Sequence, residues 1–233
     1  MSKSTLICAA TRVEAKACQQ GIDQSGLTHV FEICLTGIGL ESAARALSAR
    51  LDGADAGHIA RVVSAGFVGA AMPGVRVGAW LLGRGVRGVD SSVIEIESEK
   101  LALSLADTGL DWKSAIVTSR EKVVSFAAAP PTENLAVDME SLALARIANA
   151  RAIDFQIFRM VSDTPEEPIP EAITSLVAGV AGTEEPRFLQ TLRGTGLALG
   201  APLTFARFLA RGRSLPRLLR EGWRLSAPTF ACP

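Results

Sequence analysis

The sequence predicts an α/β domain with a mixed, largely parallel central sheet flanked by helices over residues 1–184, followed by an arginine-rich helical extension over residues 185–233. Two observations predict this class. Short apolar runs alternate with stretches of helical periodicity, as is typical of strands that helices cover on both faces. Hydrophobic residues make up 48% and charged residues 21% of the 233-residue chain, so the composition favours a globular core over disorder or a coiled coil.

The predicted elements follow one another as strand, turn and helix. The predicted strands cover residues 5–10, 30–35, 60–65, 75–82, 115–118 and 155–161, and the predicted helices begin at Arg12 and cover residues 40–51 and 139–150. Glycines follow the second and third strands, in Gly37-Ile38-Gly39 and Gly66-Phe67-Val68-Gly69. Because ligands bind beyond the carboxyl ends of the strands in such sheets, we expect the functional site at these ends.

Several common functional classes lack their sequence signals. The Gly37-Ile38-Gly39 turn lacks the third glycine of a dinucleotide fingerprint, and no phosphate-loop, nucleophile-elbow or H-E-x-x-H motif occurs. The four cysteines show no C-x-x-C spacing and only two histidines are present. We therefore expect no metal site, no disulfide scaffold and no organic cofactor, which leaves acid–base chemistry to carboxylates.

The zero net charge of the chain hides an asymmetry. Residues 1–184 carry 16 basic and 22 acidic side chains, whereas residues 185–233 carry 8 Arg and 2 Glu. Such an extension suits packing on the domain, on a second subunit or on an anionic membrane surface, and it holds no recognised nucleic-acid module, so no nucleic-acid partner is expected. Pro216 predicts a break in any long helix there.

The N-terminal apolar run is too short for a signal peptide, and no apolar run of about 18 residues occurs. The sequence therefore predicts a cytoplasmic protein, with peripheral contact at the inner membrane left open.

Acidic residues stand where a predicted strand has just ended or a helix begins. They are Glu14, Asp138 and Glu140 around Met139, and Asp163. Each position also has an ordinary structural interpretation: Asp138 suits a helix cap, and Asp163 lies in an Asp-Thr-Pro turn signal. Glu140 lies in an apolar segment, where a carboxylate requires polar partners.

Taken together, the motifs between Leu6 and Asp163 resemble those of the purine nucleoside phosphorylase and nucleosidase superfamily. They are the opening strand followed by Glu14, the Thr36-Gly37-Ile38-Gly39 turn, the strand end at Gly66-Phe67-Val68-Gly69, Val137-Asp138-Met139-Glu140, and Arg159-Met160-Val161-Ser162-Asp163. The last two motifs, separated by about twenty residues, are the specific part. The resemblance implies a nucleoside phosphorylase-like fold and cleavage of the N-glycosidic bond of a purine nucleoside, with adenine as the expected base.

The resemblance also implies a role for each matching residue. Asp163, helped by Ser162, looks like the acid that protonates or hydrogen-bonds purine N7. Glu140 looks like the carboxylate that holds the ribose hydroxyls, and Glu14 resembles the group that deprotonates the attacking water, with Arg159 nearby. Further expected substrate-binding positions are Thr36, Gly66, Phe67, Lys122, Val123, Asp138 and Met139.

Two departures from the family pattern leave the nucleophile open between water and inorganic phosphate, which would then be a co-substrate. Phe67 stands where many members have a serine that contacts phosphate or water, and the Gly-Asp-x-x-Arg loop of the hexameric phosphorylases is absent after the first strand. Asp138-Met139-Glu140-Ser141 and the arginine-rich extension look most like the hopanoid-associated phosphorylase branch, which implies release of adenine from adenosylhopane.

Other interpretations stay open at this point. One is a nucleosidase acting on methylthioadenosine, adenosylhomocysteine or futalosine, and another is a nucleoside-binding protein without turnover. Because sites in the family are commonly completed by a neighbouring subunit, the resemblance implies a homo-oligomer, with a dimer as the simplest case.

Overall fold

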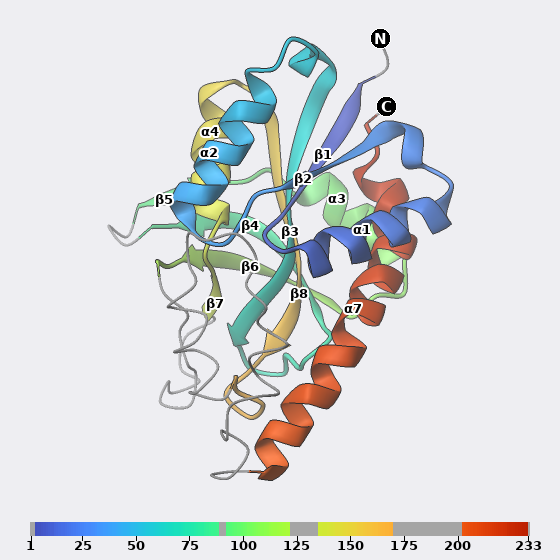
Figure 1. Cartoon of the computed structure of the whole chain (residues 1–233), viewed down its shortest axis with the longest axis vertical. Coiled ribbons are helices and arrows are strands. Elements are labelled where there is room, and N and C mark those ends of the chain that lie inside the picture. The colour runs from blue at the N-terminus through green and yellow to red at the C-terminus, as the bar shows by residue number, and fades with distance from the viewer. Residues whose placement is uncertain (1–2, 89–91, 122–134, 170–201, 233) are drawn as a thin grey trace.

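The computed structural model describes residues 3–88, 92–121, 135–169 and 202–232, and it shows helices packed around one twisted sheet (Figure 1). The strands are β1 (Ser4–Ala9), β2 (Phe31–Leu35), β3 (Ile59–Ala71), β4 (Trp80–Arg87), β5 (Val93–Glu95), β6 (Trp112–Ser119), β7 (Leu135–Asp138) and β8 (Asp154–Asp163). The helices are α1 (Arg12–Ser25), α2 (Leu40–Leu51), α3 (Glu99–Ala106), α4 (Ser141–Ala150) and α7 (Pro202–Phe230), with short 3-10 turns η1 (Thr28–Val30) and η2 (Ala56–His58).

The sheet has the strand order β2-β1-β3-β7-β6-β4-β5, and β8 pairs with both β3 and β4. Five of the eight strand pairings are parallel, and three are antiparallel. The predicted mixed, largely parallel sheet is therefore confirmed. The pairings also close β3, β7, β6, β4 and β8 into a ring, a barrel that the sequence did not predict, from which β1 and β2 extend as an open wing.

Several predicted boundaries were wrong. The strand expected over 75–82 is β4, which begins only at Trp80, because the preceding segment forms turns closed by Val75 N–H to Met72 O and Ala79 N–H to Arg76 O. The third strand does not end before its glycines but continues to Ala71, because β8 pairs with it along most of its length.

The helix expected from Met139 begins two residues later, at Ser141. The residues before Met139 belong to β7, which pairs with both β3 and β6. No glycine or proline separates this short strand from the helix that follows it. Helical periodicity alone therefore predicted a helix start that lies too close to the N-terminus.

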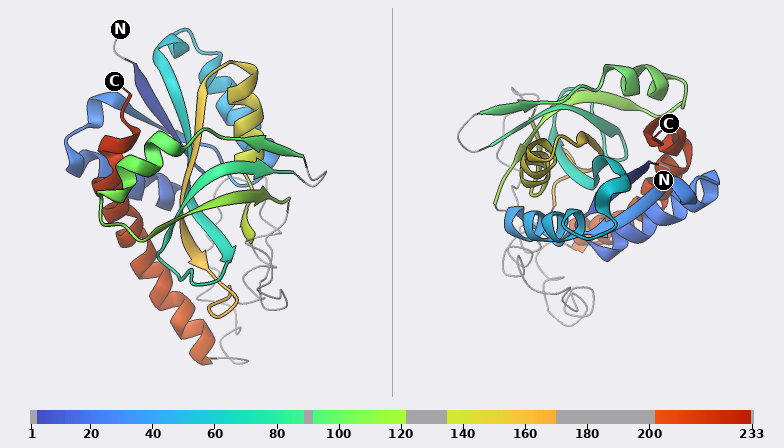
Figure 2. Two further views of the ribbon diagram at one scale, coloured as in Figure 1. Left: turned by 180° about the vertical axis from the view of Figure 1, so that it is seen from behind. Right: turned by 90° about the horizontal axis from the view of Figure 1, so that it is seen from above.

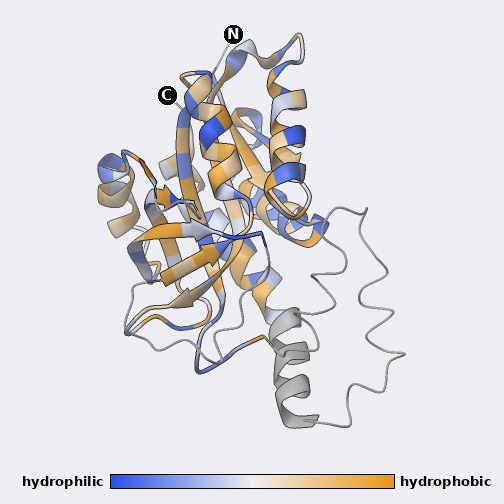
Figure 3. Cartoon of the chain, turned by 90° about the vertical axis from the view of Figure 1, so that its left-hand side faces the viewer, coloured by the Kyte–Doolittle hydropathy of each residue, from blue (hydrophilic) through white to orange (hydrophobic). Residues whose placement is uncertain are grey.

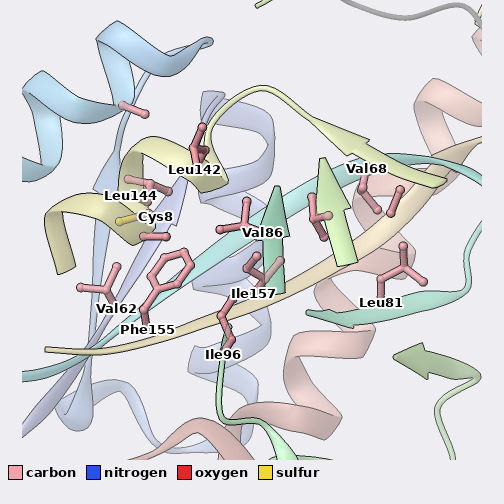
Figure 4. Packing of buried hydrophobic residues seen from close by; sticks show 14 of the residues in the cluster. Cys8, Val62, Val68, Leu81, Val86, Ile96, Leu142, Leu144, Phe155 and Ile157 are labelled. Carbon is pink, nitrogen blue, oxygen red and sulfur yellow. The ribbon is translucent and has the colours of Figure 1, made fainter. Parts of the chain in front are cut away.

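Two apolar clusters fill the space between the sheet and its helices. One lies between the sheet and the pair α2 and α4, where Figure 4 shows Val62, Leu142, Leu144 and Phe155, and it continues to Val86 and Ile157 on the barrel strands β4 and β8. The other lies on the opposite side under α1 and α7 (Figure 2). Helices thus cover both faces of the open wing, which places the carboxyl ends of β1, β2, β3 and β8 between the two layers.

Helix α7 packs its C-terminal half on the domain and continues through Pro216, contrary to the predicted break. Leu219, Trp223 and Phe230 are fully buried, and their contacts with the domain outweigh the single helical hydrogen bond that a proline removes. The N-terminal part of the helix extends past the sheet (Figure 1), and Figure 3 shows hydrophilic and hydrophobic residues alternating along the helices of the domain. Across the described ranges, no helix combines the length and hydropathy needed to cross a membrane, and the expected domain boundary at residue 184 lies outside them.

Candidate active site

Glu14 is a buried carboxylate in the first turn of α1. The segment from Thr11 to Glu14 forms a capping box: Glu14 N–H donates to Thr11 Oγ1, and Glu14 Oε2 accepts from Thr11 N and Oγ1 at 2.8 Å each. This pattern of Thr followed three residues later by Glu is a recognised sequence signal for a helix start. Glu14 is thus held in one orientation before any ligand binds.

The second oxygen of Glu14 reaches across to β3. Its Oε1 accepts a hydrogen bond from Phe67 N at 2.7 Å. Gly66 makes this approach possible, because a Cβ atom on it would lie 2.3 Å from Glu14 Oε1, and its φ of 118° also favours glycine. The carbonyl of Phe67 in turn accepts from Arg159 Nη1 at 2.8 Å, so the backbone of one residue joins Glu14 to Arg159.

Arg159, on β8, is 2% exposed and contacts two carboxylates. Its Nε lies 3.1 Å from Asp138 Oδ2, and its Nη2 donates to Glu140 Oε2 at 3.1 Å. The other oxygen of Glu140 accepts from Gly39 N at 3.0 Å, the backbone amide at the start of α2. Three carboxylates from α1, β7 and the start of α4 therefore surround one guanidinium.

This charge arrangement has consequences for protonation. Burial, together with the negative charges of Asp138 and Glu14, raises the pKa of Glu140 to about 7, although Arg159 and the Gly39 amide act in the opposite direction. Burial works against the charge of Arg159, but the three carboxylates outweigh it and raise the pKa of the guanidinium. The site thus combines a permanently charged cation with a carboxyl group that can exchange a proton near neutral pH.

Asp138 takes a structural position beneath this group. Its carboxylate accepts hydrogen bonds from Ser119 Oγ at 2.5 Å, from Ser141 N at 3.2 Å and from the Ser141 hydroxyl. The bond to Ser141 N satisfies the first amide of α4, but Glu140 and not Asp138 occupies the N-cap position of this helix. The structure shows Asp138 bonded to protein groups through both oxygens.

The remaining expected site residues lie along the same edge. Asp163 is buried at the end of β8, opposite Gly69 and four residues beyond Arg159, and its Oδ1 accepts from Ser162 Oγ at 2.6 Å. Thr36 is buried at the end of β2, where its hydroxyl donates to Ala9 O or Gly37 O.

Not every expected position can be placed in this way. Met139 is 9% exposed, between Asp138 and Glu140. Lys122 and Val123, expected to face the base, lie outside the described residues.

Several groups that build the site were not predicted from the sequence. Ser64, Ser119 and Ser141 are buried hydroxyls on three different elements, and the Gly39 amide contacts Glu140 through the backbone. Single serines in strands and at helix starts have no distinguishing pattern, whereas the capping box at Thr11 was readable from the sequence. In the described part of the chain, no three His, Cys, Asp or Glu side chains gather in a way that would hold a metal ion.

Solved structures of other proteins share this architecture. The structure of 5′-methylthioadenosine/S-adenosylhomocysteine nucleosidase from Helicobacter pylori, solved with butyl-thio-DADMe-Immucillin-A, superposes with a TM-score of 0.65 at 13% identity over 98% of both chains. A putative 5′-methylthioadenosine/S-adenosylhomocysteine nucleosidase from Borrelia burgdorferi, bound to adenine, gives 0.62 at 16% identity over 95% of this chain and 99% of that chain. The chain has the nucleosidase fold.

Futalosine hydrolase of Helicobacter pylori shares the nucleosidase fold as well, with a TM-score of 0.61 at 14% identity over 95% of this chain and 97% of that chain. No protein-family model and no curated protein matches the chain. The similarity therefore extends over nearly the whole length of the fold at low sequence identity.

Proposed function

We propose that the protein cleaves the N-glycosidic bond of an adenine nucleoside and releases the free base, with water as the nucleophile. The observation that carries this proposal is a hydrogen-bonded group in which the Phe67 backbone joins Glu14 to Arg159, and Arg159 donates directly to Glu140. The similar solved structures are those of a nucleosidase with a nucleoside analogue and of a putative nucleosidase with adenine, which agrees with this chemistry.

The proposed reaction separates charge between the sugar and the base. The C1′–N9 bond breaks with its electron pair moving to the base, and Asp163 transfers a proton to N7 so that the base leaves neutral. Positive charge develops on the ribose ring, where Glu140 in its ionised form stabilises it. The oxygen of water then bonds to C1′, and Glu14 takes the proton.

Water is favoured over phosphate by the way the cationic site is used. Arg159 donates to Ser64, to the Phe67 carbonyl and to Glu140, and it pairs with Asp138. Phe67 has no hydroxyl, and its N–H is bound to Glu14. A phosphate ion would need hydrogen-bond donors that are already occupied within the described part of this site. It would also approach the carboxylates of Glu14 and Glu140.

Chromatographic detection of free adenine tests the proposal directly. Adenosine, methylthioadenosine, adenosylhomocysteine and a 5′-alkylated adenosine are each incubated with the protein, with and without inorganic phosphate. We expect phosphate-independent release of a free base from at least one of them, and turnover of the 5′-alkylated adenosine would support the lipid-nucleoside substrate that the family resemblance implies. Release only with phosphate, alongside a sugar 1-phosphate, would contradict water as the nucleophile.

A matched pair of variants separates chemistry from folding. Asp163→Asn removes the proposed acid and should abolish base release, whereas Asp52→Asn changes an exposed carboxylate that pairs with Arg151 and should keep it. Tight nucleoside binding with no free base over a long incubation of the wild-type protein would instead favour a binding protein.

A further inference from the structure

A chain of buried hydroxyl groups leads from Arg159 to Asp138. Ser64 Oγ on β3 accepts from Arg159 Nε at 3.2 Å and from Nη2 at 2.9 Å. The same oxygen lies 2.8 Å from Ser141 Oγ at the start of α4. Both serines are 0% exposed, so no solvent competes for these bonds.

The direction of the hydrogen bonds in this chain follows from donor counting. Two N–H groups of Arg159 occupy the two acceptor positions of Ser64 Oγ, so the Ser64 hydroxyl must donate to Ser141 Oγ. Ser141 then donates to Asp138 Oδ2. The order guanidinium, Ser64, Ser141, Asp138 therefore runs in a single sense, from cation to anion, and each bond polarises the next.

We propose that Ser64 and Ser141 are positioning residues of the reaction, because their hydroxyl chain sets the orientation in which Arg159 holds Glu140 and the Phe67 carbonyl. This inference rests on the proposed function. The guanidinium is planar and its donors point in fixed directions. Holding Nε and Nη2 on Ser64 directs Nη1 to Phe67 and leaves the second N–H of Nη2 for Glu140.

The same chain explains how two carboxylates on one cation differ. Asp138 accepts from Ser119, from the Ser141 hydroxyl and from Ser141 N, so its negative charge is stabilised by hydrogen bonds. Glu140 has Arg159 and one backbone amide. If the serine chain is broken, Arg159 is free to turn away from Glu140, and the proton on Glu140 is then held more tightly.

The other ionisable groups around the pair are few among the described residues. The groups that interact electrostatically with Arg159 are Glu14 and Cys18 on α1, Cys8 on β1 and Asp138 at the end of β7. Of these groups only Asp138 is joined to the hydroxyl chain, and its bonds to Ser119 Oγ and Ser141 N do not involve the Ser64 hydroxyl. A change in the protonation of Glu140 in a Ser64 variant would therefore report the movement of Arg159.

Base release measured as a function of pH tests the proposal with Ser64→Ala and Ser141→Ala. We expect kcat/KM to fall roughly 10–100-fold in each variant, mainly through kcat, and the acidic limb of the pH profile to move to higher pH. Because both variants interrupt one chain, the double variant should lose little more than the worse single variant. Ser64→Thr keeps the hydroxyl and should retain most of the activity.

A buried serine elsewhere supplies the control. Ser226 on α7 is also 0% exposed and donates to Gly222 O at 2.8 Å, so Ser226→Ala removes a comparable hydroxyl with no link to Arg159. We expect it to leave the pH profile in place. Ser64 and Ser141 variants that behave like Ser226→Ala would overturn the proposal.

A second readout does not depend on turnover. Carbon-detected NMR titration of the Glu140 carboxyl group should show a higher pKa in Ser64→Ala than in the wild-type protein. An unchanged titration would overturn the positioning role even if the wild-type protein releases base. A shifted titration in a protein that releases no base would support the hydroxyl chain and contradict the proposed function instead.

Discussion

Replacement of Gly66 by alanine should damage the site and the fold together. A Cβ atom at this position would lie 2.3 Å from Glu14 Oε1 and 2.7 Å from its carboxyl carbon, so the carboxylate has to move. Its bond to Phe67 N would be lost, at about 1.5–3 kcal/mol for a hydrogen bond to a charged group. The φ of 118° adds about 1–3 kcal/mol of backbone strain for a residue with a side chain, which gives a total of about 3–6 kcal/mol.

Gly26→Ala provides the matched control for strain alone. Gly26 ends α1 with a φ of 78°, and a Cβ there meets nothing within 4 Å, so the substitution should cost only about 1–2 kcal/mol and leave activity unchanged. Urea denaturation measures both losses of stability, and base release is measured where each variant is folded. A Gly66→Ala protein as stable as Gly26→Ala and as active as the wild type would refute the contact between Gly66 and Glu14.

Three further changes test other parts of the structure. Glu140→Gln should abolish base release and also remove a pH dependence of stability. Because the pKa of Glu140 is raised from 4.5 to about 7, the folded state binds this proton more tightly than the unfolded state, so the stability of the wild-type protein should fall as the pH rises from about 4.5 to 7. Thermal melts at several pH values should show this slope in the wild-type protein and not in the variant. Glu14→Gln places an amide N–H₂ against donors from Thr11 or Phe67 and removes the group proposed to take the proton of water. We therefore expect kcat to fall by at least about a hundredfold in the adenine assay, and activity near wild type would exclude Glu14 as the base. Gly222→Ala puts a Cβ 1.9 Å from the ring of Trp80, so we expect a loss of roughly 1–3 kcal/mol in urea denaturation with a change in Trp fluorescence, and unchanged stability would contradict the close packing of α7.

Local sequence signals predicted the parts of the fold that depend on local chemistry. The strands β1, β2 and β8 and the helices α1 and α2 were expected near their observed positions, since each combines an apolar run or helical periodicity with a clear turn. The closure of the barrel was not predictable in this way. It depends on pairings such as Gly69 with Val137 and Leu82 with Phe158, which join strands far apart in the sequence.

The candidate site likewise contains residues that the sequence predicted and residues that it did not. Glu14, Glu140 and Arg159 were expected because their motifs resemble those of a known family, and the structure brings them into one hydrogen-bonded group. The groups that orient them were missed, because the contact between Ser64 and Arg159 spans 95 residues and that between Gly39 and Glu140 spans 101. A backbone amide and a single buried hydroxyl have no sequence signature, so only the three-dimensional arrangement reveals their role.

The balance of charge in the site gives a reason for placing three carboxylates around one arginine. Arg159 neutralises one of them, and Asp138 and Glu14 each accept hydrogen bonds from three donors of the protein. Glu140 is the group whose raised pKa accommodates the excess negative charge, by binding a proton in the free protein. In the proposed reaction the ribose ring becomes positively charged beside Glu140, and that charge can replace the proton. The carboxyl group of Glu140 then becomes negatively charged as the glycosidic bond breaks. Such a charge stabilises the transition state more than the bound substrate, and so it accelerates the reaction.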